Sequence, residues 1–148
     1  MPRDQVQVRG TVAAAPGAVW AVLRDFCGLW HPWMATITEE RGAQGALIRA
    51  FTVKGEETLY REQLTWFSDS DRSLGYRHLE GIAGCEAYDA RLTVSAAEGG
   101  GAVVVWSAVV RAPAARLVAI CDGTRAVFEA GIAALEGQAL THAAPPAP

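Results

Sequence analysis

Hydrophobic and polar residues alternate near the start of the chain. In residues 5–12, Val6, Val8 and Val12 share one side of an extended backbone, while the residues on the other side are polar. A hydrophobic period of two over this length predicts a half-buried strand.

Two short helices are expected to follow this strand. Residues 13–26 (AAAPGAVWAVLRDF) place Pro16 at a position suited to the first turn of a helix, and apolar residues follow at spacings of three and four. The aromatic segment GLWHPWM, residues 28–34, is interpreted as the second short helix, broken by Pro32.

From residue 35 to residue 111, the chain is interpreted as strands separated by turns. Turn-forming residues recur at short intervals, in residues 54–57, 68–73, 80–84 and 97–102. This spacing predicts an antiparallel meander of about six strands.

Residues 113–140 have the pattern of one long amphipathic helix that begins at Pro113. One face gathers mostly apolar residues, namely Leu117, Ile120, Thr124, Val127, Phe128, Gly131 and Leu135. A bent antiparallel sheet cannot bury its concave face alone, so this helix is expected to lie across it. Two layers joined only at their edges readily leave a cavity between them.

The sequence therefore predicts an α+β fold, in which a curved antiparallel sheet of about seven strands wraps around a long C-terminal helix. We expect residues 1–141 to form a single ligand-binding domain and residues 142–148 to form a disordered tail. The chain has 148 residues, of which 51% are hydrophobic, which is ample for one core.

Charge and composition narrow the class of protein. The net charge of -3 and the scattered cations argue against a nucleic-acid-binding surface. No apolar run reaches the roughly 18 residues of a transmembrane helix, and the N-terminus lacks the apolar core of a signal peptide, so a cytoplasmic protein is expected. Cys27, Cys85 and Cys121 have no CxxC spacing and are interpreted as reduced thiols.

Three strings carry a family resemblance: APGAVWAVLRDFCGLWHPW near the start, YREQLTWFSDSDRSLGYRHLEG in the middle and VVVWSAVV before the long helix. Together with the order of elements, they resemble the helix-grip superfamily, which includes START lipid-transfer domains and birch-pollen-allergen-like proteins. The closest resemblance is to the bacterial polyketide cyclase/dehydrase group. It implies a helix-grip fold with an internal cavity that holds a hydrophobic small molecule, such as a polyketide, an aromatic or a lipid-like metabolite.

The middle string also resembles plant abscisic acid receptors, in which the positions that match Glu62, Tyr76 and Tyr88 line the hormone pocket. The sequence departs from those receptors at both of their gating loops, which correspond here to residues 54–57 and 82–84. Hormone-receptor signalling is therefore not expected.

Strand alternation indicates which polar residues face the predicted cavity. Glu62 lies in an otherwise mostly apolar row with Thr58, Tyr60, Leu64 and Trp66. His78 shares a face with Tyr76, whereas the facing of Arg49 stays open because both faces of its strand are partly apolar. We predict that the Glu62 carboxylate points into the cavity and contacts Arg49, His78 or a ligand, because a buried carboxylate needs a partner.

The candidate catalytic residues are Glu62, His78 and Tyr88, and each has a purely structural alternative. Glu62 either closes a buried ion pair that sets the sheet register or binds a ligand oxygen. His78 is either a satisfied core residue or an acid–base group for cyclisation or dehydration. Tyr88 either packs in the core or donates a hydrogen bond to a carbonyl that becomes an enolate.

The candidate ligand-binding residues are mostly aromatic. They are Trp30, Trp33, Arg49, Phe51, Tyr60, Tyr76, Trp106, Thr124 and Phe128. Trp30 and Trp33 lie in the segment that in relatives is found at the cavity mouth. Gly131, on the inner face of the long helix, either gives a ligand room or lets the sheet approach.

Two functions from different classes fit this pattern. The first is an enzyme that resembles polyketide cyclase/dehydrases, with proton transfer by the candidate catalytic residues. The second is a non-catalytic carrier or sensor of a lipid or aromatic metabolite. The three histidines have no metal-ligand spacing and no nucleotide-binding motif is present, so no metal or cofactor is expected. The expected partner is a hydrophobic small molecule, bound to a monomer or a homodimer.

Overall fold

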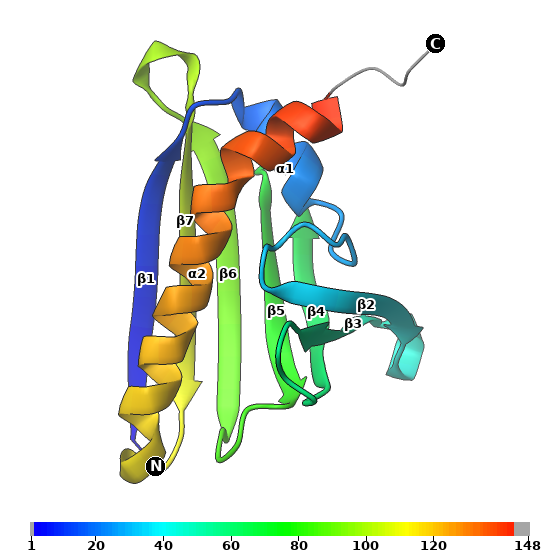
Figure 1. Cartoon of the computed structure of the whole chain (residues 1–148), viewed down its shortest axis with the longest axis vertical. Helices are drawn as coiled ribbons and strands as arrows, with labels where there is room; N and C mark the ends of the chain where they lie inside the picture. The colour runs from blue at the N-terminus through cyan, green and yellow to red at the C-terminus, as the bar shows by residue number, and fades with distance from the viewer. Residues whose placement is uncertain (1, 144–148) are drawn as a thin grey trace.

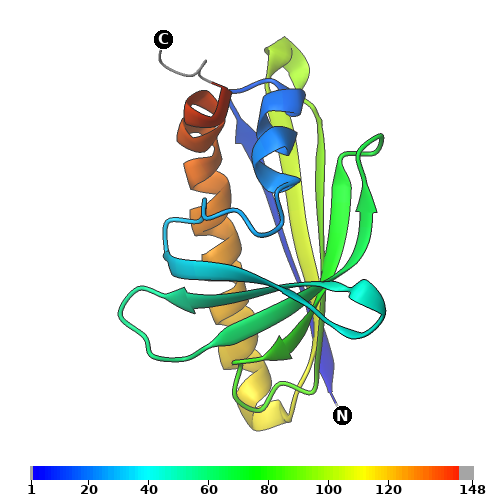
Figure 2. The ribbon, with the colours of Figure 1, turned by 90° about the vertical axis from the view of Figure 1, so that its right-hand side faces the viewer.

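Seven strands form one antiparallel sheet that curves around a long helix (Figures 1 and 2). This computed structural model describes residues 2–143. In chain order the elements are β1 (Arg3–Val12), α1 (Pro16–Leu23), β2 (Met34–Arg41), β3 (Leu47–Val53), β4 (Tyr60–Ser68), β5 (Ser73–Glu80), β6 (Ala87–Ala96), β7 (Ala102–Arg111) and α2 (Ala114–Ala143). The strand order in the sheet is β1-β7-β6-β5-β4-β3-β2. The predicted α+β helix-grip architecture is confirmed.

The core lies between the sheet and the apolar face of α2. Helix α2 runs along β1 and β7, whereas β2, β3 and β4 pass across it (Figure 2). The largest fully buried side chains come from the sheet and from both helices, and they are Val6, Val19, Val104, Val110, Phe128 and Leu135. The inner rows predicted for β6 and β7 are buried, because strict alternation holds along both strands.

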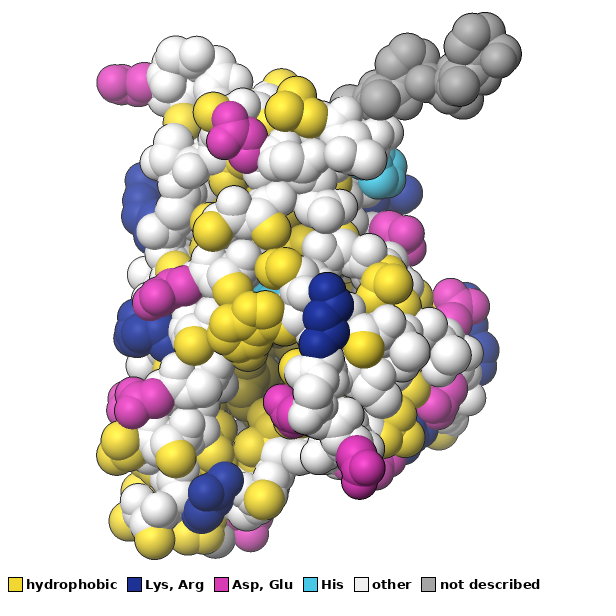
Figure 3. All heavy atoms as spheres, viewed as in Figure 1, with side chains coloured by type: hydrophobic (Ala, Val, Ile, Leu, Met, Phe, Trp, Pro, Cys, Tyr) yellow, Lys and Arg dark blue, Asp and Glu magenta, His cyan; other side chains and the backbone are white. Residues whose placement is uncertain are grey.

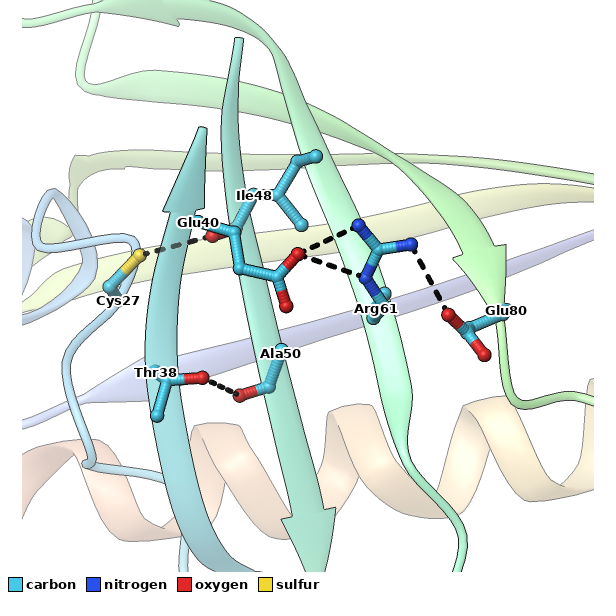
Figure 4. A network of polar contacts seen from close by, with 7 residues as sticks. All are labelled: Cys27, Thr38, Glu40, Ile48, Ala50, Arg61 and Glu80. Atoms are coloured by element: carbon cyan, nitrogen blue, oxygen red, sulfur yellow. Dashed lines mark hydrogen bonds and ion pairs between the residues drawn. The ribbon is translucent and has the colours of Figure 1, made fainter. Parts of the chain in front are cut away.

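Arg61 and Glu62 are neighbours on β4 and point to opposite faces of the sheet. The Arg61 Nη2 donates to Glu40 of β2 at 2.7 Å, and its Nη1 donates to Glu80 of β5 at 3.2 Å, on the face away from α2 (Figure 4). Glu62 is 9% exposed and pairs with Arg49 on the inner face. The prediction that Glu62 points inward therefore has the correct register.

One part of the β4 prediction is wrong. A bulge lies between Leu64, which pairs with Tyr76, and Trp66, which pairs with Gly75. The extra residue reverses the alternation, so Trp66 turns to the outer face, where it is 39% exposed and lies 4.3 Å from the Arg91 guanidinium.

The second short helix is also absent, although the first forms as expected. Residues 24–33 make turns instead, with Gly28 N–H donating to the Asp25 carbonyl and Met34 N–H to the His31 carbonyl. Pro32 explains the difference, because it lacks an N–H group and its ring disfavours helical geometry at His31.

Helix α2 continues beyond the predicted end at residue 140. It includes Thr141, His142 and Ala143, so the start of the predicted tail is helical, and residues 144–148 lie outside the described residues. Within residues 2–143, neither helix is long and apolar enough to cross a membrane.

Candidate functional site

A cavity of about 490 Å³ lies between the concave face of the sheet and α2. Its mouth is framed by the β3–β4 loop, the β5–β6 loop, the first half of α2 and the segment before β2. The space-filling view shows this hollow beside α2, with hydrophobic side chains in its wall (Figure 3). Its position agrees with the predicted space between the two layers.

The structure brings eleven of the twelve predicted site residues to the cavity wall. They are Trp30, Trp33, Arg49, Phe51, Tyr60, Glu62, Tyr76, Tyr88, Trp106, Thr124 and Phe128. The exception is His78, which does not line the cavity. The wall is thus mainly aromatic, and its polar side chains come from β3, β4, β5, β6 and α2.

A buried ion pair between Arg49 of β3 and Glu62 of β4 forms the most polar part of the wall. These residues are register partners, and the Arg49 Nε donates to Glu62 Oε1 at 2.8 Å. The Arg49 Nη1 donates to the Phe26 carbonyl at 3.1 Å. The guanidinium also lies 4.1 Å from the Phe26 ring centre and 4.7 Å from that of Tyr76. Burial alone lowers the pKa of Arg49, but attraction to Glu62 and Tyr76 outweighs it and leaves that pKa raised.

Two tyrosines beside this pair stay protonated in the folded protein. Burial, with the nearby Glu62 charge, raises the pKa of Tyr76 well above its ordinary value. Burial also raises the pKa of Tyr88, and hydrogen bonding with Thr124 opposes only part of the rise. The Tyr76 hydroxyl accepts a hydrogen bond from Trp106 Nε1 at 3.0 Å. Both hydroxyls therefore keep a proton that can be donated in a hydrogen bond.

His78 lies on the predicted face of β5 but at its end, next to the β5–β6 loop. Its Nε2 accepts a hydrogen bond from the Ile82 N–H at 3.3 Å, and its ring contacts the edge of Tyr88 at 6.1 Å between centroids. Burial lowers its pKa. This geometry supports a positioning role for the loop, because Ile82 itself lines the cavity.

His31 also lines the cavity. It belongs to the segment that the sequence analysis expected at the cavity mouth, but no contact was predicted for it. Trp33 N–H donates to His31 Nδ1 at 3.1 Å, so in the neutral ring Nε2 carries the proton and donates to the Val127 carbonyl of α2 at 2.8 Å. His31 thus ties the segment before β2 to the middle of α2. The neighbouring Gly131 makes this approach possible, since a Cβ there would lie 3.0 Å from the His31 ring.

The His31 geometry predicts a loss of stability in mild acid. Burial lowers the pKa of His31, so near and below the unfolded-state value of about 6.5 the unfolded chain binds more protons. This contribution is complete above that pH and decreases as the pH falls, by at most about 1.4 kcal/mol per pH unit. Urea unfolding between about pH 7.5 and about pH 5.5 should show a shallower pH dependence in His31→Gln than in wild type. Equal slopes would contradict the prediction.

The mouth contains further residues that the sequence reasoning did not single out. Glu56 accepts a hydrogen bond from the Tyr60 hydroxyl at 2.6 Å, and burial with this contact raises the pKa of Tyr60 to about 12. Arg116 of α2 donates to the Ala83 carbonyl at 3.2 Å. Each contact has one partner in a loop. Loops have no periodic pattern of hydrophobic residues, so the sequence does not indicate where their side chains point.

No three His, Cys, Asp or Glu side chains within residues 2–143 gather as a metal ion would require. The polar side chains of the wall are the Arg49–Glu62 pair, several hydroxyl groups, His31, and Glu56 and Arg116 near the mouth.

The model of one family, described as polyketide cyclase/dehydrase and lipid transport, matches residues 3–139 of this chain. The chain belongs to this family. Among curated proteins, no sequence matches at a significant level.

Proteins from several organisms have solved structures with a similar fold. The Zhui aromatase/cyclase from Streptomyces sp. R1128 is 21% identical with a TM-score of 0.73, over 97% of both chains. A norcoclaurine synthase point mutant from Thalictrum flavum, solved with a transition-state analogue, is 19% identical with a TM-score of 0.73, over 97% of this chain and 98% of the other. A Thermobifida fusca protein solved by NMR is 25% identical with a TM-score of 0.77, over 94% and 95%. At 21% and 19% identity, the first two comparisons show that the fold is shared.

Proposed function

We propose that this protein binds a hydrophobic small molecule in the cavity between α2 and the sheet. The observation that carries the proposal is a cavity of about 490 Å³ with mostly aromatic walls and a few convergent polar groups. Cavities of this size and composition are typical of small-molecule sites. Membership of the polyketide cyclase/dehydrase and lipid transport family supports the same proposal.

The arrangement of the wall indicates how the ligand would lie. Trp106 stacks on Phe128 with centroids 4.3 Å apart, and Phe51 stacks on Tyr60 at 5.4 Å, so flat apolar surfaces face the cavity from two sides. The Arg49–Glu62 pair provides one polar region between them. An aromatic or polycyclic ligand with an oxygen function at one end fits these features.

A bulky residue at Gly123 is expected to weaken ligand binding at least about tenfold, because it would occupy the cavity mouth. Gly123 lies on α2 in the cavity wall, and a Cβ there meets no atom within 4 Å. Gly123→Phe should therefore fold normally while its ring obstructs entry. The measurement is titration with N-phenyl-naphthylamine, an uncharged dye whose fluorescence increases in apolar surroundings.

Gly137→Phe is the matched control. Gly137 is also a helical glycine of α2 with open space at its Cβ, but it is exposed and lies outside the cavity wall. The control should bind the dye like wild type. Failure of wild type to bind, or equal binding by both variants, would overturn the proposal.

Acid–base catalysis of cyclisation or dehydration is the second candidate function. The observation that favours it is that Tyr88, a protonated donor, and Glu62, a carboxylate, line the same cavity. Tyr88 would donate to a carbonyl oxygen as it becomes an enolate, and Glu62 would take up a proton. Incubation with a synthetic poly-β-ketothioester, followed by mass spectrometry, separates the two functions. An enzyme forms a product that has lost water, and a carrier returns the thioester unchanged.

A further inference from the structure

The cavity wall carries equal numbers of positive and negative side chains. Arg49 and Glu62 lie in its buried part, and Arg116 and Glu56 lie near its mouth. Within the described residues no other Asp, Glu, Lys or Arg lines the cavity. The wall histidine, His31, is neutral because its Nδ1 accepts a hydrogen bond from a backbone N–H. The site that a ligand enters therefore has no net charge.

Arg49 and Glu62 each keep one polar atom available on the cavity side. Arg49 uses Nε and Nη1 for Glu62 and the Phe26 carbonyl, and Glu62 accepts through Oε1. Within residues 2–143, Arg49 Nη2 and Glu62 Oε2 have no hydrogen-bond partner. Every fully buried side-chain N or O atom in the same range has one, so these two atoms are not fully buried. Both atoms are therefore accessible, and the cavity is the space that both residues line. Together they offer a donor and an acceptor side by side.

We infer that the cavity selects ligands whose buried end forms hydrogen bonds but carries no charge, such as a ketone, an amide or a phenol. The inference rests on the proposed function, that a hydrophobic small molecule occupies this cavity. A neutral group can accept from Arg49 Nη2 or donate to Glu62 Oε2 without disturbing the ion pair. Carboxylates and amidinium or ammonium groups are rejected.

Charged ligands are rejected because Arg49 and Glu62 already compensate each other's charge. A ligand carboxylate that approaches Arg49 also meets Glu62, whose Oε1 lies 2.8 Å from the Arg49 Nε. It would leave one uncompensated negative charge beside two side chains that are largely buried, which is strongly unfavourable. A ligand cation meets the same difficulty with Arg49, with opposite sign. Glu62 is thus a specificity-determining residue against anions, and Arg49 against cations.

Three probes of nearly the same shape test this inference in the wild-type protein. Naphthamide is neutral, naphthoate is an anion and naphthamidine is a cation at neutral pH. Calorimetric titration should give naphthamide an affinity at least about tenfold higher than either charged probe. Equal affinities, or a charged probe that binds more tightly, would overturn the inference and leave the proposed function intact. Absence of binding by all three would overturn the inference, and it would overturn the proposed function as well if N-phenyl-naphthylamine does not bind either.

Two variants extend the test by removing one charge at a time. In Glu62→Gln the Arg49 cation is uncompensated, so naphthoate should bind at least about tenfold more tightly than naphthamide. In Arg49→Gln the preference should pass to naphthamidine for the same reason. Glu57→Gln removes one negative charge from an exposed position of the β3–β4 loop that does not line the cavity, and it should keep the wild-type order because water screens that position. If Glu62→Gln or Arg49→Gln folds and keeps the wild-type order, the inference is contradicted. If neither of these two variants folds, the wild-type titration decides.

Discussion

Replacement of Glu62 with leucine is expected to lower the free energy of unfolding by about 3–5 kcal/mol, because it leaves the Arg49 cation buried without its partner. Arg49 and Glu62 are each 9% exposed, and their contact is 2.8 Å long. The aromatic faces of Phe26 and Tyr76 enclose the guanidinium but do not compensate its charge. Urea or guanidinium chloride unfolding, followed by tryptophan fluorescence, measures the change.

The double variant Arg49→Met/Glu62→Leu separates the cost of an unpaired charge from the cost of lost packing. Removal of both charges should recover most of the stability, because apolar replacement of a buried pair is often close to neutral. It should not recover all of it, since the Phe26 carbonyl loses its donor, at about 1–3 kcal/mol if water does not replace it. A cost below about 1 kcal/mol for Glu62→Leu alone would show that the pair is solvated.

Much of this site could be predicted from strand alternation alone. Glu62, Tyr76 and Tyr88 lie on three different strands, and each lines the cavity, on the face to which strand alternation assigns it. Antiparallel pairing then brings them together, since β4, β5 and β6 are neighbours in the sheet. Local periodicity and the order of strands were sufficient for this part.

Alternation did not settle the position of Arg49. Both faces of its strand contain apolar residues, and the structure shows why: Ile48 is also buried, with its side chain near Gly42 of the β2–β3 turn and its carbonyl near the Cys27 thiol. A strand covered on both sides has no single apolar face. The partner of Glu62 was therefore one of several options until the register of β3 and β4 was known.

The remaining differences come from features without a periodic signal. The bulge that turns Trp66 outward inserts one residue, and the contacts of His31 depend on a turn far from α2 in the sequence. The role of Gly131 was open for the same reason. The Trp106 and His31 side chains occupy the space in which a side chain at Gly131 would lie. Gly131 therefore allows other elements to approach the helix closely, and it does not make room for a ligand.

Gly131→Ala is therefore expected to destabilise the protein by about 1–3 kcal/mol, although alanine is the better helix former. A Cβ at Gly131 would lie 2.8 Å from Trp106 Cζ3 and 3.0 Å from His31 Cδ2. Neither ring can move cheaply. Trp106 is stacked on Phe128 and donates to the Tyr76 hydroxyl, and both His31 ring nitrogens form hydrogen bonds.

Gly137→Ala makes the same chemical change six residues later in α2 and should have the opposite effect. Its Cβ meets nothing within 4 Å, so only the helix propensity changes, and the variant should gain about 0.5–1 kcal/mol. The two variants should then differ by about 1.5–4 kcal/mol in free energy of unfolding, measured by urea denaturation under one set of conditions. If Gly131→Ala is as stable as Gly137→Ala, Trp106 and His31 are not held against α2 as the structure describes. The binding site would then lack one of its rigid walls, because both rings face the cavity as well as the helix.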